Sequence, residues 1–243
     1  MRFVIMHKTT PHWEAGAKPG PGLLAKVERM IAGMADAGVL LGAEGLRESS
    51  LGVRLRFSGG RRTVVEGPFV GGNELPAGFA LLRVESIDDA VAWATRFAGV
   101  MGDMEIDIRP LSEPWDLGIA PKPEGLTTTR FMAMHKADAA SEAGARPSPA
   151  QLAAMGRLVE EMSRAGVLLA TEAFQPSSKG ARLRSAGGKH ELVDGPFTES
   201  KELVGGYVIV RAESLDEAKV WALRYVDAVG CSELDVRPLA ERA

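Results

Sequence analysis

His7 and His135 each stand at the end of an apolar segment, and each is followed by a lysine. A histidine titrates near neutral pH and can serve as general acid, general base or metal ligand. We therefore treat both as candidate catalytic residues, with Lys136 as a candidate anion-binding group. The alternative is a structural histidine, hydrogen-bonded at the edge of a core. No HxH or HxxxH spacing accompanies either residue, so no metal site is predicted.

Several carboxylates are candidates to orient a histidine or to act as acid or base. Asp194 opens an Asp-Gly-Pro-Phe motif, and Glu66 stands at the corresponding position earlier in the chain. Asp can form a turn by bonding its own backbone, whereas Glu retains only the charge, so the exchange favours a role for the charge. Glu44 and Glu172 each follow a short apolar strand and are further candidates. The alternative for these two is a strand-end surface charge.

Four arginines occur as two Arg-Leu-Arg segments, Arg54 with Arg56 and Arg182 with Arg184. In a strand, residues two apart point to the same face, so each pair shares one face. Two guanidinium groups on a cavity wall would bind a carboxylate or a phosphate. On a face turned to water they would be a solvated stripe. The sequence leaves both interpretations open.

These candidates belong to a sequence written twice. A constant spacing of 128 residues relates His7 to His135 and Trp93 to Trp221, and it also relates the two Gly-Pro-Phe motifs. Loops normally absorb insertions, so a constant spacing indicates two copies of one domain. The predicted organisation is a first repeat over residues 1–112, a linker over 113–128 and a second repeat over 129–243. Each copy is expected to have its own core.

The two copies differ in charge just after the Gly-Pro-Phe motif. Glu74 and Glu202 correspond, but Glu199 and Lys201 have no charged counterpart in the first repeat. One interpretation is that an ancestral site has decayed in one copy. The first repeat would then act as a scaffold for the second.

Within a copy, the periodicity of apolar residues predicts the elements that position these side chains. The pattern is a strand, an amphipathic helix ending at a glycine, two or three strands with a Gly-Gly hairpin, a helix capped by serine, and a last strand. In the first repeat these segments are residues 2–8, 23–38, 53–57, 63–65, 79–84, 86 onward and 105–111. Ser214 and Glu217 are expected to form a capping box in the second repeat.

The order of elements fits a ferredoxin-like α+β domain, with helices on one face of a mainly antiparallel sheet. Alternate residues of a strand point to opposite faces of the sheet, and the opening strand is apolar at four successive positions, Phe3, Val4, Ile5 and Met6. The face of the sheet away from the helices therefore also needs a cover. We therefore predict two tandem ferredoxin-like domains that form an intrachain pseudo-dimer of the dimeric α+β barrel type. A cavity between the two sheets would be the site.

Composition narrows the classes of function. The 243 residues carry a net charge of −3, with a pI near 5.9, so no basic excess is available for nucleic acid. The first apolar run is too short for a signal or membrane segment, which predicts a cytoplasmic protein. Cys231 is the only cysteine, so neither an intrachain disulfide nor a thiolate zinc cluster can form. No dinucleotide, P-loop or other cofactor motif occurs, and no cofactor is predicted.

The stretch VDGPFTESKELVGGY at 193–207 resembles the DGPF branch of the YCII-related family, and residues 141–184 look like the same branch. The resemblance covers nearly all of the second repeat, and the constant spacing extends it to the first. It implies the same barrel-type fold, with tandem members known. It also implies either an enzyme built on a His and an Asp or an association with extracytoplasmic-function sigma factors. His135 can take the enzymatic role only if the fold brings it near Asp194.

Two functions therefore stay open. The first is a small-molecule enzyme or binding protein, in which His135 acts as acid or base, Asp194 or Glu172 orients it, and Arg182 and Arg184 hold an anion. The second is a non-enzymatic accessory protein that binds a sigma factor in transcription regulation. The sequence does not decide whether the protein is an enzyme, and association of further copies of the chain is open.

Overall fold

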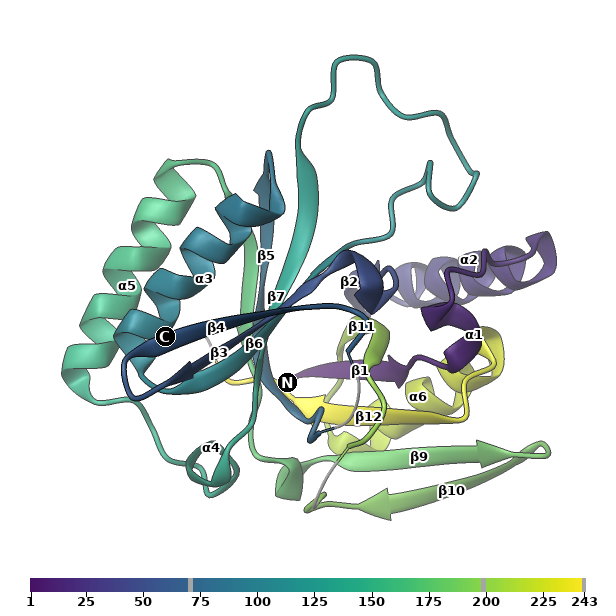
Figure 1. The fold of residues 1–243 in the computed structure, drawn as a ribbon. Coiled ribbons are helices and arrows are strands. Elements are labelled where there is room, and N and C mark those ends of the chain that lie inside the picture. Colours follow the sequence, from purple (N-terminus) through teal and green to yellow (C-terminus); the bar gives the residue numbers. More distant parts are fainter. Residues whose placement is uncertain (70–71, 198–199, 242–243) are drawn as a thin grey trace. The chain divides into compact units, whose positions relative to one another are not determined.

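The computed structural model describes residues 1–69, 72–197 and 200–241, and it is an α+β fold with two six-stranded antiparallel sheets (Figure 1). The chain divides into two compact units. Unit 1 comprises Met1–Gly45 and Phe174–Ala243, and unit 2 comprises Leu46–Ala173. Each unit contains one of the sheets together with the helices that pack on it.

The sheet of unit 1 has the strand order β10-β9-β12-β1-β11-β2. Its strands are β1 (Arg2–Lys8), β2 (Leu40–Gly45), β9 (Ala181–Ala186), β10 (Lys189–Asp194), β11 (Val204–Arg211) and β12 (Glu233–Pro238). The long helices α2 (Pro21–Asp36) and α6 (Leu215–Val229) pack on each other and on this sheet. Two short helices complete the unit, α1 (Pro11–Glu14) and the 3-10 helix η2 (Ser177–Lys179).

The sheet of unit 2 repeats this arrangement in the order β4-β3-β6-β7-β5-β8. Its strands are β3 (Val53–Ser58), β4 (Arg61–Glu66), β5 (Pro76–Val84), β6 (Met104–Pro110), β7 (Thr129–Lys136) and β8 (Leu168–Ala173). Its helices are α3 (Ile87–Met101), α4 (Ala139–Glu142), α5 (Pro149–Arg164) and the 3-10 helix η1 (Ser49–Leu51). In each unit four strands have the ferredoxin-like order, and a hairpin extends the sheet at one edge.

The two repeats are not the two compact units, because they exchange their opening segments. Strand β1 of the first repeat lies between β11 and β12 of the second, and β7 of the second lies between β5 and β6 of the first. The expectation that each repeat has its own core is therefore wrong. Phe3 and Val208 share one core, and Leu82 and Phe131 share the other, so each core draws on both repeats.

The elements themselves follow the sequence pattern closely. Strand β1 spans the expected residues, and α2 begins at Pro21, where a missing N–H costs no hydrogen bond. Ser86 caps α3 and forms a capping box with Asp89. The predicted box in α6 is only half formed: Ser214 Oγ accepts from Glu217 N, but the Glu217 carboxylate accepts from the backbone N–H of Glu213 instead. Both repeats thus begin their last helix at the expected serine.

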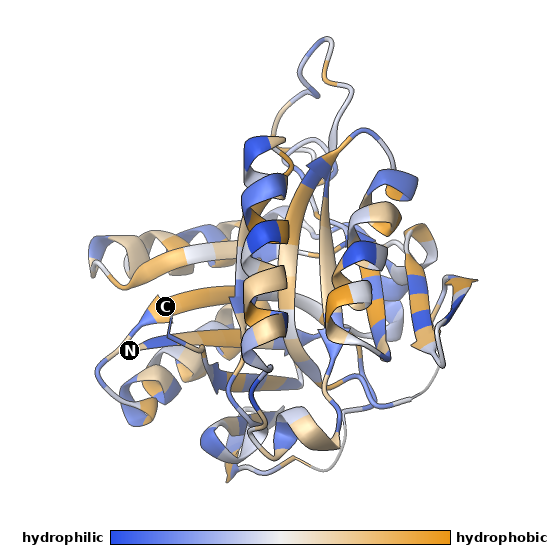
Figure 2. Ribbon diagram, turned by 90° about the vertical axis from the view of Figure 1, so that its left-hand side faces the viewer, coloured by the Kyte–Doolittle hydropathy of each residue, from blue (hydrophilic) through white to orange (hydrophobic). Residues whose placement is uncertain are grey.

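Both faces of the central strands are buried. In β1, Phe3 and Ile5 belong to the core beneath the helices, while Val4 and Met6 on the opposite face are also buried. Figure 2 shows these strands as largely hydrophobic, whereas the helices carry hydrophilic and hydrophobic residues on different sides. The sequence pattern predicted that both faces of this strand are covered, and the burial of successive residues in β1 confirms it. The prediction that the sheets enclose a cavity stays a prediction.

Within the described ranges, no helix has both the length and the apolar composition that a membrane crossing requires.

Candidate functional site

The strand exchange assigns the proposed histidine and aspartate to different compact units. His135 lies on β7 in unit 2, whereas Asp194 ends β10 in unit 1. Asp194 has a side chain that is 76% exposed, and it pairs with Lys219 Nζ of α6 at 3.0 Å. Its counterpart Glu66 is also exposed. The acid of the Asp-Gly-Pro-Phe motif therefore stands on the surface, paired with a lysine.

The two histidines lie on the helix side of their sheets, half-buried at the ends of β1 and β7. His7 Nδ1 is 2.9 Å from the hydroxyl of Tyr225 on α6. His135 instead lies against the ring of Phe97 on α3, with ring centroids 5.4 Å apart. Burial lowers the pKa of each imidazole to about 4, and the charge of Lys8 adds to this effect at His7. Both rings are therefore neutral at physiological pH.

Glycines leave room for these two rings. A Cβ on Gly78 of β5 would lie 2.7 Å from His135 Cε1, and one on Gly206 of β11 would lie 2.7 Å from His7 Cε1. Neither distance is compatible with a side chain at that position. The Gly-Gly of the VGGY segment thus has a packing role beneath His7, in agreement with the structural interpretation of these histidines.

The opposite face of each sheet carries a row of polar and apolar side chains aligned across five strands. In unit 2 the register aligns Glu172, Phe79, Met134, Asp107 and Arg54. In unit 1 the same register aligns the counterparts Glu44, Tyr207, Met6, Asp235 and Arg182. Glu172 and Arg54 are both buried at the two ends of such a row. The sequence-predicted arginine and glutamate therefore do share a face, with apolar residues between them.

Unit 2 contains a closed quartet of buried charges in this row. Arg54 donates from Nε and Nη2 to Asp107 at 2.6 and 2.8 Å, and from Nη2 to Glu74 at 2.8 Å. Lys136 Nζ pairs with Asp107 at 2.8 Å and also bonds Glu74. Two cations thus meet two carboxylates. We call Arg54, Lys136, Asp107 and Glu74 the unit 2 quartet.

The neighbouring charges of the quartet shift the pKa values of Arg54 and Asp107 in opposite directions. Burial alone lowers the pKa of Arg54, but the hydrogen bond and charge of Asp107, aided by Glu74, raise it above its ordinary value. Burial alone raises the pKa of Asp107, and the Arg54 hydrogen bond and the Lys136 charge bring it below its ordinary value. Arg54 and Asp107 are therefore both charged at neutral pH, where each buried charge requires the other.

Unit 1 contains the corresponding arginine, lysine and aspartate. Arg182 donates to Asp235 from Nε and Nη2 at 2.6 and 3.0 Å, and Lys8 Nζ pairs with Asp235 at 2.9 Å. Glu202, the counterpart of Glu74, is exposed and acts on Arg182 through its charge alone. Among the described residues, Lys8 Nζ is fully buried and has no carboxylate partner except Asp235. We call Lys8, Arg182 and Asp235 the unit 1 trio.

The Gly-Pro-Phe motif helps to build each cluster. A Cβ on Gly67 would lie 1.8 Å from Ser49 O, so only glycine lets this turn pack against η1. Ser49 Oγ accepts from Phe69 N at 3.1 Å, and the Phe69 ring then lies over the Arg54 guanidinium at 4.6 Å. In unit 1, Gly195, Ser177 and Phe197 repeat these contacts on Arg182. The motif therefore places an aromatic ring on one face of the buried arginine.

The two arginines of each Arg-Leu-Arg segment have different roles. Arg54 and Arg182 are buried in the clusters, whereas the side chains of Arg56 and Arg184 are 54% and 55% exposed. Arg56 pairs with Glu105, and Arg184 pairs with Glu233. The solvated-stripe alternative thus describes only the outer arginine of each pair.

Sequence reasoning missed the acids that hold these arginines. Asp107 and Asp235 are buried at the centre of the clusters, and Lys8 and Glu74 complete them. The signal was present: the segments EIDIR and ELDVR place acids at alternate positions, and Arg-Leu-Arg places bases at alternate positions. Charges with the same period of two on neighbouring antiparallel strands are expected to pair.

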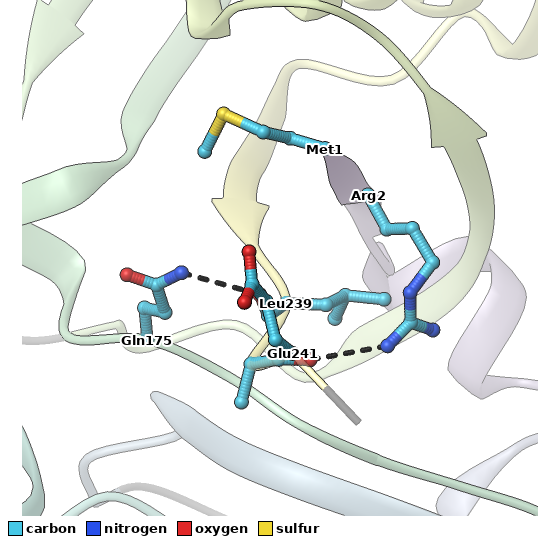
Figure 3. Close-up of a pocket in the computed structure, with 6 residues that line it drawn as sticks. Met1, Arg2, Gln175, Leu239 and Glu241 are labelled. Carbon is cyan, nitrogen blue, oxygen red and sulfur yellow. Dashed lines mark hydrogen bonds between the residues drawn. The ribbon is translucent and has the colours of Figure 1, made fainter. Parts of the chain in front are cut away.

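A separate hollow of about 160 Å³ lies where β1 begins and β12 ends in unit 1 (Figure 3). Arg2 and Gln175 line it, and each already donates to a backbone carbonyl, of Ala240 and Leu239 respectively. It is smaller than the usual ligand pocket of roughly 300 Å³ or more, and it contains none of the predicted site residues. In the described part of the chain, no group of three or more His, Cys, Asp or Glu residues is arranged to hold a metal ion.

Comparison with known families agrees with this architecture. The YCII-related domain matches the chain twice, over residues 1–105 and 129–239. The chain belongs to the YCII-related family. Its two matches correspond to the two sequence repeats, so this YCII-related protein is a tandem of two family domains that exchange strands. Assignment to the DGPF branch stays a prediction.

A relative from Rhizobium meliloti (strain 1021), the "Uncharacterized protein R00369", is 36% identical over 77 residues. These residues are 31% of this chain, and the chain spans 62% of the relative's length. The relative's name carries no activity, so the functional argument rests on the chemistry of the two clusters.

Proposed function

We propose that the protein binds a small anionic molecule in unit 1, at Lys8 and Arg182. The observation that carries the proposal is the environment of the buried lysine in each cluster. Lys136 contacts two carboxylates in unit 2, Asp107 and Glu74, whereas among the described residues Lys8 pairs only with Asp235 in unit 1. A buried ammonium is costly unless its hydrogen bonds and charge are satisfied. A bound anion would satisfy both.

A chain of charges leads from the surface of unit 1 to this position. Arg184, half exposed, pairs with Glu233 at 3.2 Å, and Glu233 lies 3.4 Å from Arg182 Nε. Arg182 and Lys8 then meet at Asp235. Outer charges of this kind attract an anion, and the inner guanidinium and ammonium supply the donors that hold it. In this proposal Arg182 and Arg184 have the anion-binding role that the sequence analysis predicted.

In this proposal the histidines have no catalytic step. His7 and His135 lie on the helix side of their sheets, whereas the arginines and Lys8 lie on the opposite face. The proposal is therefore binding rather than turnover. The accessory role beside a sigma factor stays a prediction of the family resemblance.

The test is a thermal-shift titration with acetate, phosphate and sulfate at constant ionic strength. We expect at least one anion to stabilise the wild-type protein, by about 2.7 kcal/mol at 100 times its Kd. Lys8→Met should abolish that shift. Lys136→Met is the matched control, because it removes the corresponding lysine from the closed quartet and should leave the shift in place. Equal shifts in wild type and Lys8→Met would refute the proposal.

A further inference from the structure

Strand β4 forms an outer edge of the sheet in unit 2. Among the described strands it pairs with β3 alone, and five of its six residues are exposed. Val64, near its centre, is 45% exposed. An edge strand presents unpaired backbone N–H and C=O groups, to which another strand can bind.

The outward backbone groups of β4 belong to Arg62, Val64 and Glu66. Gly67 N donates to Gly52 O at 3.1 Å, so in the register of this hairpin the odd-numbered residues bond toward β3. Hydrogen bonds alternate between the two sides of an antiparallel strand, so the even-numbered residues direct their N–H and C=O groups outward. The side chains of these three residues share one face of the sheet, because they are two positions apart.

This row of side chains is self-complementary, because a base, an apolar residue and an acid follow one another along it. In an antiparallel pair centred on Val64, Arg62 of one copy lies opposite Glu66 of the second copy. The two Val64 side chains then meet at the two-fold axis. A shift by one step of the same symmetry places Arg62 opposite Val64 or beyond the end of the strand. Only the register centred on Val64 therefore matches both charge pairs.

Both charges of the row are available to a second copy. Arg62 donates to the neutral hydroxyl of Thr95 on α3 at 2.9 Å. Within the part of the chain that the structure describes, neither Arg62 nor Glu66 has an oppositely charged partner.

The corresponding edge strand of unit 1, β10, has its charges paired within the chain. Its row has the same order of base, apolar residue and acid, namely His190, Leu192 and Asp194. Helix α6 supplies a partner at each end: His190 Nε2 lies 3.2 Å from Asp227 Oδ1, and Lys219 Nζ lies 3.0 Å from the acid. The residues at these two positions of α3 are Gly99 and Val91, which carry no charge. The other two sheet edges, β2 and β8, contain no basic residue.

We infer that β4 pairs with β4 of a second copy of this chain, antiparallel and in the register centred on Val64. The pairing joins two unit 2 sheets across a two-fold axis, and it closes at two copies because each β4 is used once. A six-residue edge is short, so the dimer forms and dissociates with concentration. The inference is independent of anion binding in unit 1.

Analytical ultracentrifugation over a range of protein concentrations tests this edge. We expect wild type to pass from monomer to dimer as the concentration rises. Val64→Lys brings two ammonium groups together at the axis and should stay monomeric. Leu192→Lys is the matched control on β10 and should dimerise like wild type. A wild type that is monomeric at its highest soluble concentration, or a dimer that survives Val64→Lys, would overturn the inference.

Charge reversal tests the register and separates loss of pairing from loss of folding. Glu66→Arg sets Arg62 of each copy opposite a like charge, so we expect dimerisation to weaken about tenfold. The double variant Arg62→Glu with Glu66→Arg exchanges the two signs and should restore the dimer. A double variant as weak as Glu66→Arg alone would contradict the register.

A disulfide gives a direct readout of the same contact. Opposite residues of a hydrogen-bonded strand pair have Cα atoms about 5.5 Å apart, within the range of a disulfide. The native Cys231 is buried. Under mild oxidation we expect a covalent dimer of Val64→Cys and none of Leu192→Cys. The reverse result would assign the interface to β10 and overturn the inference.

Discussion

The two units place the same buried arginine, lysine and aspartate on the same strands, but they complete the cluster differently. In unit 2 the loop before β5 carries Glu74 inward, and the charges balance. In unit 1 the corresponding loop leaves Glu202 exposed, and Lys8 relies on Asp235. In unit 2 the side chain of Asn73 accepts from Leu75 N just around Glu74, and Lys201 stands at the position of Asn73 in unit 1. Duplication has thus preserved the buried arginine, lysine and aspartate, while Glu74 and its counterpart Glu202 differ in burial.

The largest loss of stability is expected from replacing the central aspartates, and the loss should be larger for Asp235 than for Asp107. Asp235→Ala removes the shared carboxylate of Lys8 and Arg182, so we expect a loss of about 3–5 kcal/mol in the free energy of unfolding. Asp107→Ala should cost less, because Glu74 still contacts both cations of unit 2. Urea unfolding of the two variants side by side measures the difference. A larger loss for Asp107→Ala would contradict the assigned charge balance.

The glycine of the Gly-Pro-Phe motif comes next, and here the units should behave alike. A Cβ on Gly67 or Gly195 would lie 1.8 or 1.9 Å from a serine carbonyl oxygen. We expect Gly67→Ala and Gly195→Ala each to destabilise the protein by about 3 kcal/mol, because the turn must move and carry its phenylalanine away from the arginine. Thermal unfolding provides the measurement. Gly99→Ala is the control, since a Cβ there meets no neighbouring atom.

The histidines should make the protein sensitive to acid. Their folded pKa of about 4 lies below the ordinary 6.5, so between these values the unfolded chain binds more protons than the folded one. Stability is then fully present above pH 6.5 and falls as the pH decreases toward 4, by about 2 kcal/mol for each histidine at pH 5. Free energies of unfolding at pH 5 and 7.5 for wild type, His7→Gln and His135→Gln test this. The variants should show a shallower pH dependence, and an unchanged slope would argue against neutral, buried imidazoles.

A smaller loss of stability is expected from removing the Tyr225 hydroxyl. This hydroxyl distinguishes the surroundings of His7 in unit 1 from those of His135 in unit 2. Tyr225→Phe removes the partner of His7 and makes this contact resemble that of His135 with Phe97. We expect a loss of about 1 kcal/mol, the usual net worth of one hydrogen bond. Chemical denaturation measures it. The comparison in unit 2 is Phe97→Tyr made in the His135→Gln variant. This double variant should be more stable than His135→Gln alone only if the added hydroxyl finds a hydrogen-bond partner.

The sequence predicted the elements well, since the apolar period of β1 and the caps at Ser86 and Ser214 depend on neighbouring residues. The strand exchange was not predictable from pattern, because β1 and β7 have similar apolar faces and suit either partner.

The site was predicted in part for the same reason. Arg54 and Arg182 were identified from Arg-Leu-Arg, but their partners depend on which strands are neighbours. His135 and Asp194 were grouped because the family resemblance implies a His and an Asp, and the exchange assigned them to different units. The inward direction of Glu74 and the exposure of Glu202 depend on a local turn that periodicity does not describe.

The central claim is that the buried ammonium of Lys8 in unit 1 helps to hold an anion, whereas Glu74 engages the corresponding Lys136 in unit 2. The most direct test is the number of acetate molecules bound per chain, measured by titration of [¹³C]acetate with wild type, Lys8→Met and Lys136→Met. Our account predicts one site in wild type, none in Lys8→Met and one in Lys136→Met. Binding that survives Lys8→Met, or is lost only in Lys136→Met, would contradict it.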